Sequence, residues 1–145
     1  MRPDTLRRLD DDFEKHPATV AGPVPMPEVA ALEQRTGFSL PQDYLEFVAR
    51  YGGGIVGPYV IHGLRAAEAM GDDEASALDV TWRFRKQRWR GTEAWLVISA
   101  DHAGNPVGLD KDGKVWISDH DAGVVEIIAS SFEAYLLERC LHMAE

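Results

Sequence analysis

A helix with a marked beginning and a marked end is encoded between Phe38 and Gly54, in the stretch FSLPQDYLEFVARYGGG. Pro41 suits a first helical turn because its ring fixes φ and no N–H is needed there. Four large side chains then follow at i, i+3, i+4 and i+7, which is the spacing of one helical face: Tyr44, Phe47, Val48 and Tyr51. The glycines from Gly52 to Gly54 permit the positive φ of a sharp exit. We therefore predict a buried helix that the other elements pack against.

Helical spacing recurs at both ends of the chain. Residues 2–15 place Leu6, Leu9 and Phe13 on one side, and the acidic run Asp10–Asp12 fans out over the other, as on a solvated face. A shorter helix is expected over residues 28–36.

Near the C-terminus, Ser130 and Glu133 have the spacing of a capping box, which predicts a final helix to about Leu141. Its buried face would hold four residues: Phe132, Tyr135, Leu136 and Cys140.

Residues 76–90 fit two patterns. Val80, Trp82 and Phe84 alternate with polar residues, which is the period of a strand. A helical stripe also exists, and the length of the segment with its good helix formers favours a helix; this stripe comprises Leu78, Trp82, Arg85 and Trp89. We predict a helix with both tryptophans packed inward.

Short β-rich runs make up most of the remaining chain. Residues 59–62 form one such run, and residues 94–100, 105–110, 114–120 and 124–128 read as an antiparallel meander with a hairpin turn at Asp112-Gly113. The expected fold class is α+β: a single domain with a twisted antiparallel sheet of about four to six strands and helices packed mainly on one side.

Composition limits the class of protein. With 145 residues, 45% hydrophobic and 27% charged, the chain suits one globular domain. No apolar run approaches the ~20 residues of a membrane span, and the charged N-terminus does not resemble a signal peptide. Cys140 is the only cysteine, which excludes an internal disulfide and favours a reducing compartment, so we expect a cytoplasmic protein.

Charge is distributed unevenly along the chain. The net charge is −9, yet residues 80–92 hold five basic residues and no acidic one, leaving 10 basic against 24 acidic residues elsewhere. An acidic body disfavours nucleic acid and favours a basic partner, although solubility alone also accounts for a negative surface. Aromatics among the arginines of residues 80–92 could stack on single-stranded nucleic acid, but the acidic remainder argues against it.

An ordered set of short motifs resembles the SUKH superfamily, small intracellular domains that include fungal cell-wall regulators and many bacterial toxin-immunity proteins. The set comprises Leu40-Pro41, Asp43-Tyr44, Phe47, the Gly-Gly exit, Trp95–Ser99, Asp101 with Gly104-Asn105, Leu109-Asp110, Gly113–Trp116, Asp119–Asp121 and Ser131–Leu136. The resemblance implies one SUKH-like domain over residues 1–145, with the N-terminal helix and linker of residues 1–22 outside the matched core.

The same resemblance implies a non-enzymatic immunity protein that binds a cognate toxin, commonly a nuclease. A regulatory or scaffold domain for a cellular partner is the alternative, and a metal-dependent hydrolase is a third. No catalytic residue or cofactor is expected, the partner would be a basic toxin domain, and the chain would be a monomer or weak homodimer. The candidate partner-binding carboxylates are Asp72, Asp73, Glu74, Asp101, Asp119 and Asp121.

Two turns of the meander offer the one set of residues that could bind a metal ion. In such a sheet the loops after the first and third strands share an edge, so their histidines and carboxylates should lie near one another. The set comprises Asp101, His102, Asp119, His120 and Asp121. The competing interpretation, which we favour, is that the aspartates cap turns by accepting bonds from nearby backbone N–H groups.

Overall fold

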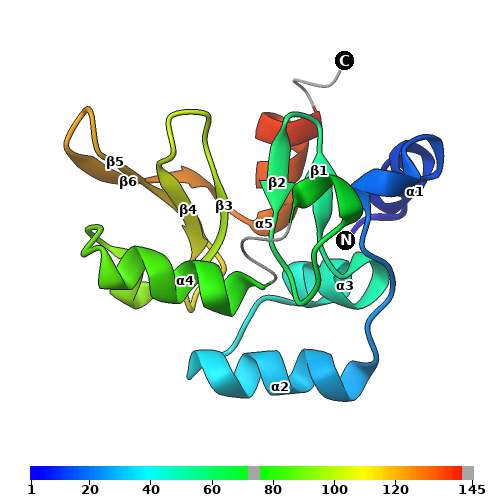
Figure 1. Cartoon of the computed structure of the whole chain (residues 1–145), viewed down its shortest axis with the longest axis horizontal. Coiled ribbons are helices and arrows are strands. Elements are labelled where there is room, and N and C mark those ends of the chain that lie inside the picture. The colour runs from blue at the N-terminus through cyan, green and yellow to red at the C-terminus, as the bar shows by residue number, and fades with distance from the viewer. Residues whose placement is uncertain (72–75, 142–145) are drawn as a thin grey trace.

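The computed structural model describes residues 1–71 and 76–141, which form an α+β domain with two antiparallel sheets (Figure 1). Its helices are α1 (Pro3–Lys15), α2 (Met26–Thr36), α3 (Gln42–Tyr51), α4 (Ala77–Lys86) and α5 (Phe132–Tyr135), which continues as a π-helical turn, η4 (Leu136–Leu141). The strands are β1 (Gly54–Val56), β2 (Tyr59–Ile61), β3 (Leu96–Ala100), β4 (Pro106–Leu109), β5 (Val115–Asp119) and β6 (Val124–Ala129). Three short 3₁₀ turns are η1 (Pro17–Thr19), η2 (Glu68–Met70) and η3 (Thr92–Ala94).

Helix α3 lies at the centre of the core, as its spacing predicts. All four residues of the predicted face are buried. The rings of Tyr44 and Phe47 meet Phe132 of α5 edge to face, with centroids 5.1 and 5.4 Å apart. Gly52 ends the helix at φ 75°, and a Cβ there would lie 2.4 Å from the carbonyl oxygen of Gly22. Glycine is therefore needed at this exit both for its conformation and for its size.

The predicted meander is confirmed as the four-stranded sheet β3-β4-β5-β6. Its register pairs Val107 with Ile117 and Gly108 with Trp116. Side chains alternate between the two faces because successive residues of a strand point in opposite directions. One face contributes to the main core with α3 and α5, and the other packs against α4 through Val97. The helices thus cover both faces, with α4 alone on the second (Figure 1).

The strands form two sheets rather than the single sheet expected. The hairpin β1–β2 stands beside β3 and meets it at a seam with few bonds: the His62 N–H donates to the Ile98 carbonyl at 2.7 Å, and the Ser99 hydroxyl donates to the Val60 carbonyl at 2.7 Å. Tyr135 of α5 in turn donates to Ser99 Oγ at 3.2 Å. Strand β1 was not predicted, because its glycine was read only as part of the exit from α3.

Helix α4 confirms the helical interpretation of residues 76–90 but not its predicted face. Trp82 is 69% exposed, so its inward placement was wrong. The buried side instead carries Val80, Thr81 and Phe84. The Thr81 hydroxyl accepts a bond from the Val97 N–H at 2.8 Å, which orients the helix on β3. Trp89 lies beyond the end of α4 and packs, partly buried, against the cluster of Val80, Phe84 and Val97, so its inward placement is confirmed.

Helix α1 contributes to the hydrophobic core, although it lies outside the segment on which the family resemblance rests. Leu9 is fully buried and Phe13 is 6% exposed, in the same cluster as the face of α3. The Tyr51 hydroxyl of α3 donates to Asp10 Oδ1 at 2.7 Å, so the acidic run is not purely a solvated face.

The final helix begins one residue later than the predicted capping box. Ser131, not Ser130, is the N-cap, and its hydroxyl accepts a bond from the Ala134 N–H at 3.0 Å. Glu133 does not complete a capping box. Its carboxylate instead accepts from the Arg2 N–H at 2.9 Å, which ties α1 to α5. The four residues of the predicted buried face are all buried.

Candidate functional site at the loop end of the sheet

The turns β3–β4 and β5–β6 lie together at one end of the sheet, as the meander predicts. A single buried side chain joins them. Asn105 is 3% exposed, its Nδ2 donates to Asp101 Oδ2 at 2.9 Å, and its Oδ1 accepts from the His120 N–H at 2.9 Å. The two turns that carry the candidate residues are therefore fixed relative to each other.

The aspartates of these turns hold the local backbone. Asp101 Oδ1 accepts bonds from the N–H groups of Ala103 and Asn105, at 3.0 and 2.9 Å. Asp119 Oδ1 accepts from the N–H groups of Asp121 and Ala122, both at 3.0 Å. These are the short-range bonds that make aspartate common in turns. The geometry matches the competing interpretation of the metal-ligand set.

The two histidines point to different neighbours. His102 stacks on Tyr59 of β2 with ring centroids 4.9 Å apart, whereas His120 meets Trp89 edge to face at 5.5 Å. Among residues 1–71 and 76–141, no group of three or more histidine, cysteine, aspartate or glutamate side chains is placed to hold a metal ion. The structure thus brings the two turns together without converging their side chains on one point.

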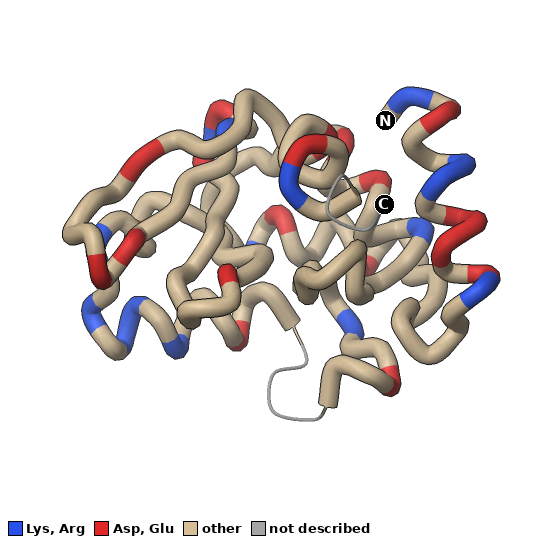
Figure 2. Tube along the Cα trace, turned by 90° about the horizontal axis from the view of Figure 1, so that it is seen from above, with Lys and Arg blue, Asp and Glu red and all other residues tan. Residues whose placement is uncertain are grey.

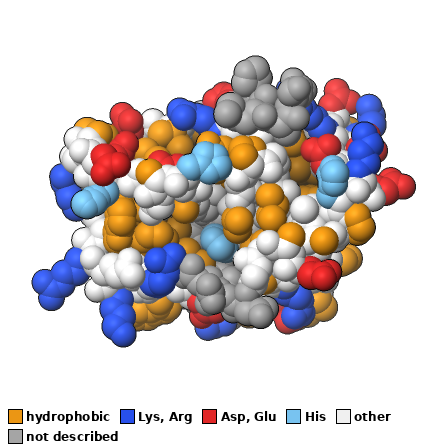
Figure 3. All heavy atoms as spheres, turned by 45° about the horizontal axis from the view of Figure 1, so that its top comes forward, with side chains coloured by type: hydrophobic (Ala, Val, Ile, Leu, Met, Phe, Trp, Pro, Cys, Tyr) orange, Lys and Arg blue, Asp and Glu red, His pale blue; other side chains and the backbone are white. Residues whose placement is uncertain are grey.

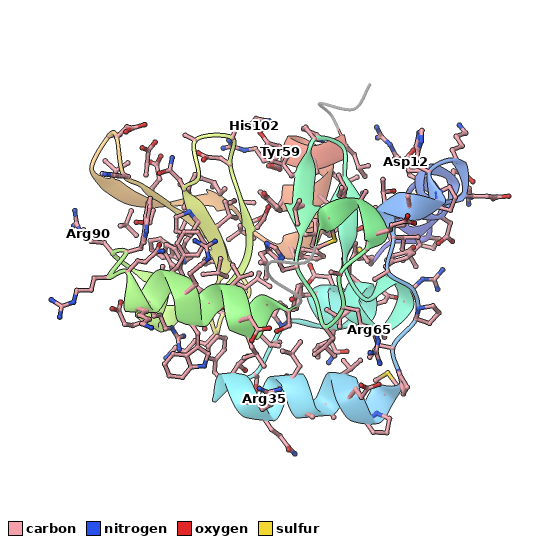
Figure 4. All side chains as sticks on the ribbon, in the orientation of Figure 1. Asp12, Arg35, Tyr59, Arg65, Arg90 and His102 are labelled. Carbon is pink, nitrogen blue, oxygen red and sulfur yellow. The ribbon has the colours of Figure 1, made fainter. Side chains whose placement is uncertain are left out.

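A groove opens where the two sheets diverge above the seam. Tyr59 and His102 lie side by side at its mouth, one from β2 and the other from the β3–β4 turn (Figure 4). The cavity measures about 350 Å³. Its walls come from β2, α4 and the start of the β3–β4 turn, and they include Val60, Met70, Val80, Arg83, Phe84 and Asp101. Figure 3 shows this face hollowed near its centre, with hydrophobic side chains on both sides of the hollow.

A second pocket of about 330 Å³ lies on the other side of Phe84 and Trp89, whose rings meet edge to face at 5.5 Å. It is lined by residues 87–90 and by the β5–β6 turn, including Asp119 and His120. Phe84 lines the groove and Trp89 lines the second pocket, so this pair of rings lies between the two hollows.

The charges at this end are mixed. Asp101, Asp119 and Asp121 lie on the two turns, but Arg88 and Arg90 line the second pocket beside Asp119. Figure 2 shows basic positions of α4 and the following loop gathered at one end of the molecule, next to acidic ones. The remaining candidate carboxylates, Asp72, Asp73 and Glu74, fall outside the described residues.

Three contributors to this end were missed from the sequence. Asn105 was read as the start of a strand and as part of a turn motif, Tyr59 only as a strand residue, and Trp89 only as core. The signal for Asn105 was present, because a polar residue between Gly104 and a proline that starts a strand is well placed to cap two turns. The partners of Tyr59 and Trp89 depend on how the two sheets diverge, which no local pattern encodes.

Comparisons with known proteins add a family to this geometry. A search among curated proteins returns no match. Every helix among the described residues is too short or too polar to cross a membrane. Residues 23–138 match the family described as SMI1 / KNR4 family (SUKH-1). Because the matched segment covers most of the chain, from the approach to α2 into the last helical turn, this protein belongs to the SMI1 / KNR4 (SUKH-1) family.

Proposed function

We propose that this chain is a non-enzymatic immunity protein of the cytoplasm, which neutralises a cognate toxin domain by binding it directly. Membership of the SUKH family is consistent with roles in toxin immunity or cell-wall regulation. The observation that carries the proposal is the groove between the sheets, with the stacked pair of Tyr59 and His102 at its mouth. An aromatic side chain beside a hollow is a typical anchor point of protein interfaces.

A binding role rather than catalysis is supported by how the ionisable groups are used. The carboxylates of Asp101 and Asp119 accept bonds from the backbone of their own turns. The thiol of Cys140 is buried, which raises its pKa to about 12 and keeps it protonated and unreactive. A general base or nucleophile would need a group within reach of substrate and poised to exchange a proton.

The acidic exterior favours a basic partner. The chain carries a net charge of −9, and Asp101, Asp119 and Asp121 contribute to it at the loop end. Nuclease sites that grip phosphates are rich in lysine and arginine. A negative partner would approach such a site under electrostatic attraction, which raises the association rate more than the final affinity.

The experiment pairs the purified chain with the toxin domain encoded by a neighbouring gene. We expect a complex that blocks the toxin, and we expect Tyr59→Ala to raise the dissociation constant about tenfold or more, since anchors of this kind contribute over 1 kcal/mol. Met26→Ala is the matched control, because Met26 is a large apolar side chain that is 64% exposed on α2. The association rate should fall as salt rises, and should fall less steeply when Asp121, an exposed residue of the β5–β6 turn, is changed to lysine.

Two results would overturn the proposal. A complex that tolerates Tyr59→Ala as well as Met26→Ala would remove the groove as the binding surface. Failure to bind or block any neighbouring toxin, together with recovery of a cellular regulator from the native host, would replace immunity with the scaffold function.

A further inference from the structure

The second pocket, between residues 87–90 and the β5–β6 turn, combines basic, polar and apolar side chains. It is lined on one side by Gln87, Arg88, Trp89 and Arg90, and on the other by Ser118 and His120 with two valines, Val124 and Val125. At about 330 Å³ it is the size of a small-ligand site. Donors and apolar groups therefore face the same hollow.

The two arginines of this pocket carry charge that no carboxylate balances. Within residues 1–71 and 76–141, neither Arg88 nor Arg90 has an aspartate or glutamate at ion-pair distance; the recorded pairs involve the N-terminal amine, Arg2, Arg7, Arg50 and Arg65. Arg85, close by in sequence, is occupied differently, since it donates to the carbonyls of Thr92, Glu93 and Trp95. In a chain of net charge −9, two unbalanced guanidinium groups at one pocket are a local reversal of sign.

The backbone holds Arg88 at the pocket rim at some cost. Arg88 has φ 61°, the left-handed conformation that usually selects glycine after a helix. Its N–H donates to the Arg85 carbonyl at 3.0 Å, and the Trp89 N–H donates to the Phe84 carbonyl at 3.2 Å, which together form a Schellman motif. The contact between Phe84 and Trp89 completes the motif. A strained residue retained where glycine would fit better suggests that its side chain is used.

Across the pocket, Arg90 Nη1 donates to the Gly123 carbonyl at 3.3 Å, which sets this side chain against the β5–β6 turn. Asp119 is the only carboxylate in the lining, and it already accepts two backbone bonds, from Asp121 and Ala122. Both bonds go to Oδ1, so this carboxylate holds the turn. The two guanidinium groups still leave the lining with a net positive charge.

We propose that this pocket binds a phosphomonoester. Guanidinium groups match the oxygens of phosphate and donate to them in pairs, and His120 and Ser118 add further donors on the opposite wall. Val124, Val125 and Trp89 provide apolar surface for the organic part. The group could be carried by a free small molecule or by a phosphorylated side chain of a protein. This site does not depend on toxin binding, which is assigned to the groove on the other side of Phe84.

The test is a titration of the whole chain with phenyl phosphate, inorganic phosphate and a phosphoserine tetrapeptide, at about pH 7 where the phosphate is mostly dianionic. Low salt, about 20 mM, limits screening. The readouts are calorimetry and the shift of the Trp89 indole N–H resonance. We expect phenyl phosphate to bind with a dissociation constant of about 1 mM or tighter and to move the Trp89 resonance.

Three variants distinguish a specific binding pocket from general electrostatic attraction between the basic segment and any anion. Arg88→Gly and Arg90→Gln should each raise the dissociation constant about tenfold, the value of one charge-assisted contact. Arg88→Gly should also raise the melting temperature, because glycine adopts the backbone conformation freely, so weaker binding there is not caused by unfolding. Lys86→Gln is the matched control: it removes one positive charge from the same segment, at an exposed position outside the pocket.

The outcomes are distinct. The proposal is supported if Arg88→Gly and Arg90→Gln weaken the binding of phenyl phosphate and Lys86→Gln does not. Tighter binding of the phosphopeptide than of phenyl phosphate assigns the ligand to a protein partner. Equal weakening by all three variants, or no shift of the Trp89 resonance at about 20 mM ligand, well above the expected dissociation constant, overturns it. Inorganic phosphate binding as tightly as phenyl phosphate overturns the assignment of an organic part.

Discussion

Asn105 is one side chain on which two turns depend. It is almost fully buried, and it bonds the carboxylate of Asp101 on one side and the backbone of His120 on the other. Neither turn has another bond of this kind to the other among the described residues. Beyond the pairing of β4 with β5, the relative position of the two turns therefore rests on the geometry of a single amide.

Replacing Asn105 tests this dependence. Asn105→Ala should lower the free energy of unfolding by about 1–3 kcal/mol, because it leaves buried polar groups without their partner. Urea unfolding measures the change. Lys111→Ala, at an exposed position of the next turn, is the control and should stay within about 0.5 kcal/mol of the parent. If both variants unfolded alike, the amide would not be joining the turns.

At the scale of elements, α1 behaves as part of the domain although the family match begins at residue 23. Leu9 and Phe13 fill the core beside Tyr51, whose ring lies 5.0 Å from that of Phe13. Arg2 and the N-terminal amine reach Glu133 and Glu46. Helix α1 thus packs into the same core as the segment that matches the family.

Truncating the buried leucine of α1 should show its contribution. Leu9→Ala should cost about 2–5 kcal/mol of unfolding free energy, the usual range for a buried leucine. The exposed Arg7→Ala on the same helix should change stability by no more than about 0.5 kcal/mol. Chemical denaturation with a single shared transition is expected, since α1 and α3 bury their side chains in one cluster. A separate early transition for α1 would contradict this.

The junction of α1 with α5 should respond to acid through Glu133. Burial alone would raise the pKa of Glu133, but hydrogen bonds from Thr5 and Arg2 outweigh it and hold the pKa below its usual value. A carboxyl with a lowered folded pKa stabilises the fold above its unfolded pKa, near 4.3, and loses this as pH falls through the folded value. Glu133→Gln should therefore reduce the loss of stability on acidification below about pH 4.5. If Glu133→Gln lost stability on acidification as steeply as the parent, the hydrogen bonds to Glu133 would not contribute to that loss.

Local patterns predicted the elements better than their contacts. Apolar spacing located α3 and its buried face, because those side chains all point to one core. The same use of apolar spacing wrongly placed Trp82 in the core. A helix that lies over a sheet buries only a narrow face, and Val80 and Phe84 already fill that face. The seam between the two sheets includes the bond from Tyr135 to Ser99, which are 36 residues apart, and no short pattern in the sequence predicts such a bond.

For the candidate site, too, the sequence predicted the location better than the contacts. Its position followed from strand order, since the turns after β3 and β5 share an edge of the sheet, where Asn105 joins them. The groove did not follow, because it exists only where β2 diverges from β3. The basic pocket depends on a left-handed Arg88, which the sequence does not distinguish from any other arginine.

Over the whole molecule, two buried phenols hold the seam between the sheets. Tyr44 donates to the His62 carbonyl at 2.7 Å, and Tyr135 donates to Ser99 Oγ. Burial raises the pKa of both tyrosines above the ordinary value. A raised folded pKa means that the stabilisation is complete below the unfolded pKa, near 10, and is lost as pH rises toward the folded value.

Alkaline conditions should therefore unfold the protein cooperatively. We expect the free energy of unfolding to fall steadily above about pH 10, and Tyr135→Phe to flatten that fall at some cost in stability at neutral pH. Circular dichroism across pH measures both. Met26→Ala, on the exposed Met26 of α2, is the control and should leave the fall in stability at alkaline pH unchanged. A slope insensitive to Tyr135→Phe would exclude its phenol as the linked group.

The bond from Arg8 Nη2 to the Leu141 carbonyl, at 2.9 Å, brings the first helix against the last helical turn. The polypeptide therefore closes on itself, and fluorescent labels on these two segments would transfer energy efficiently in the native fold. Release of the first helix would separate the dyes while the rest stayed folded, giving an optical measure of whether this protein opens in pieces or all at once.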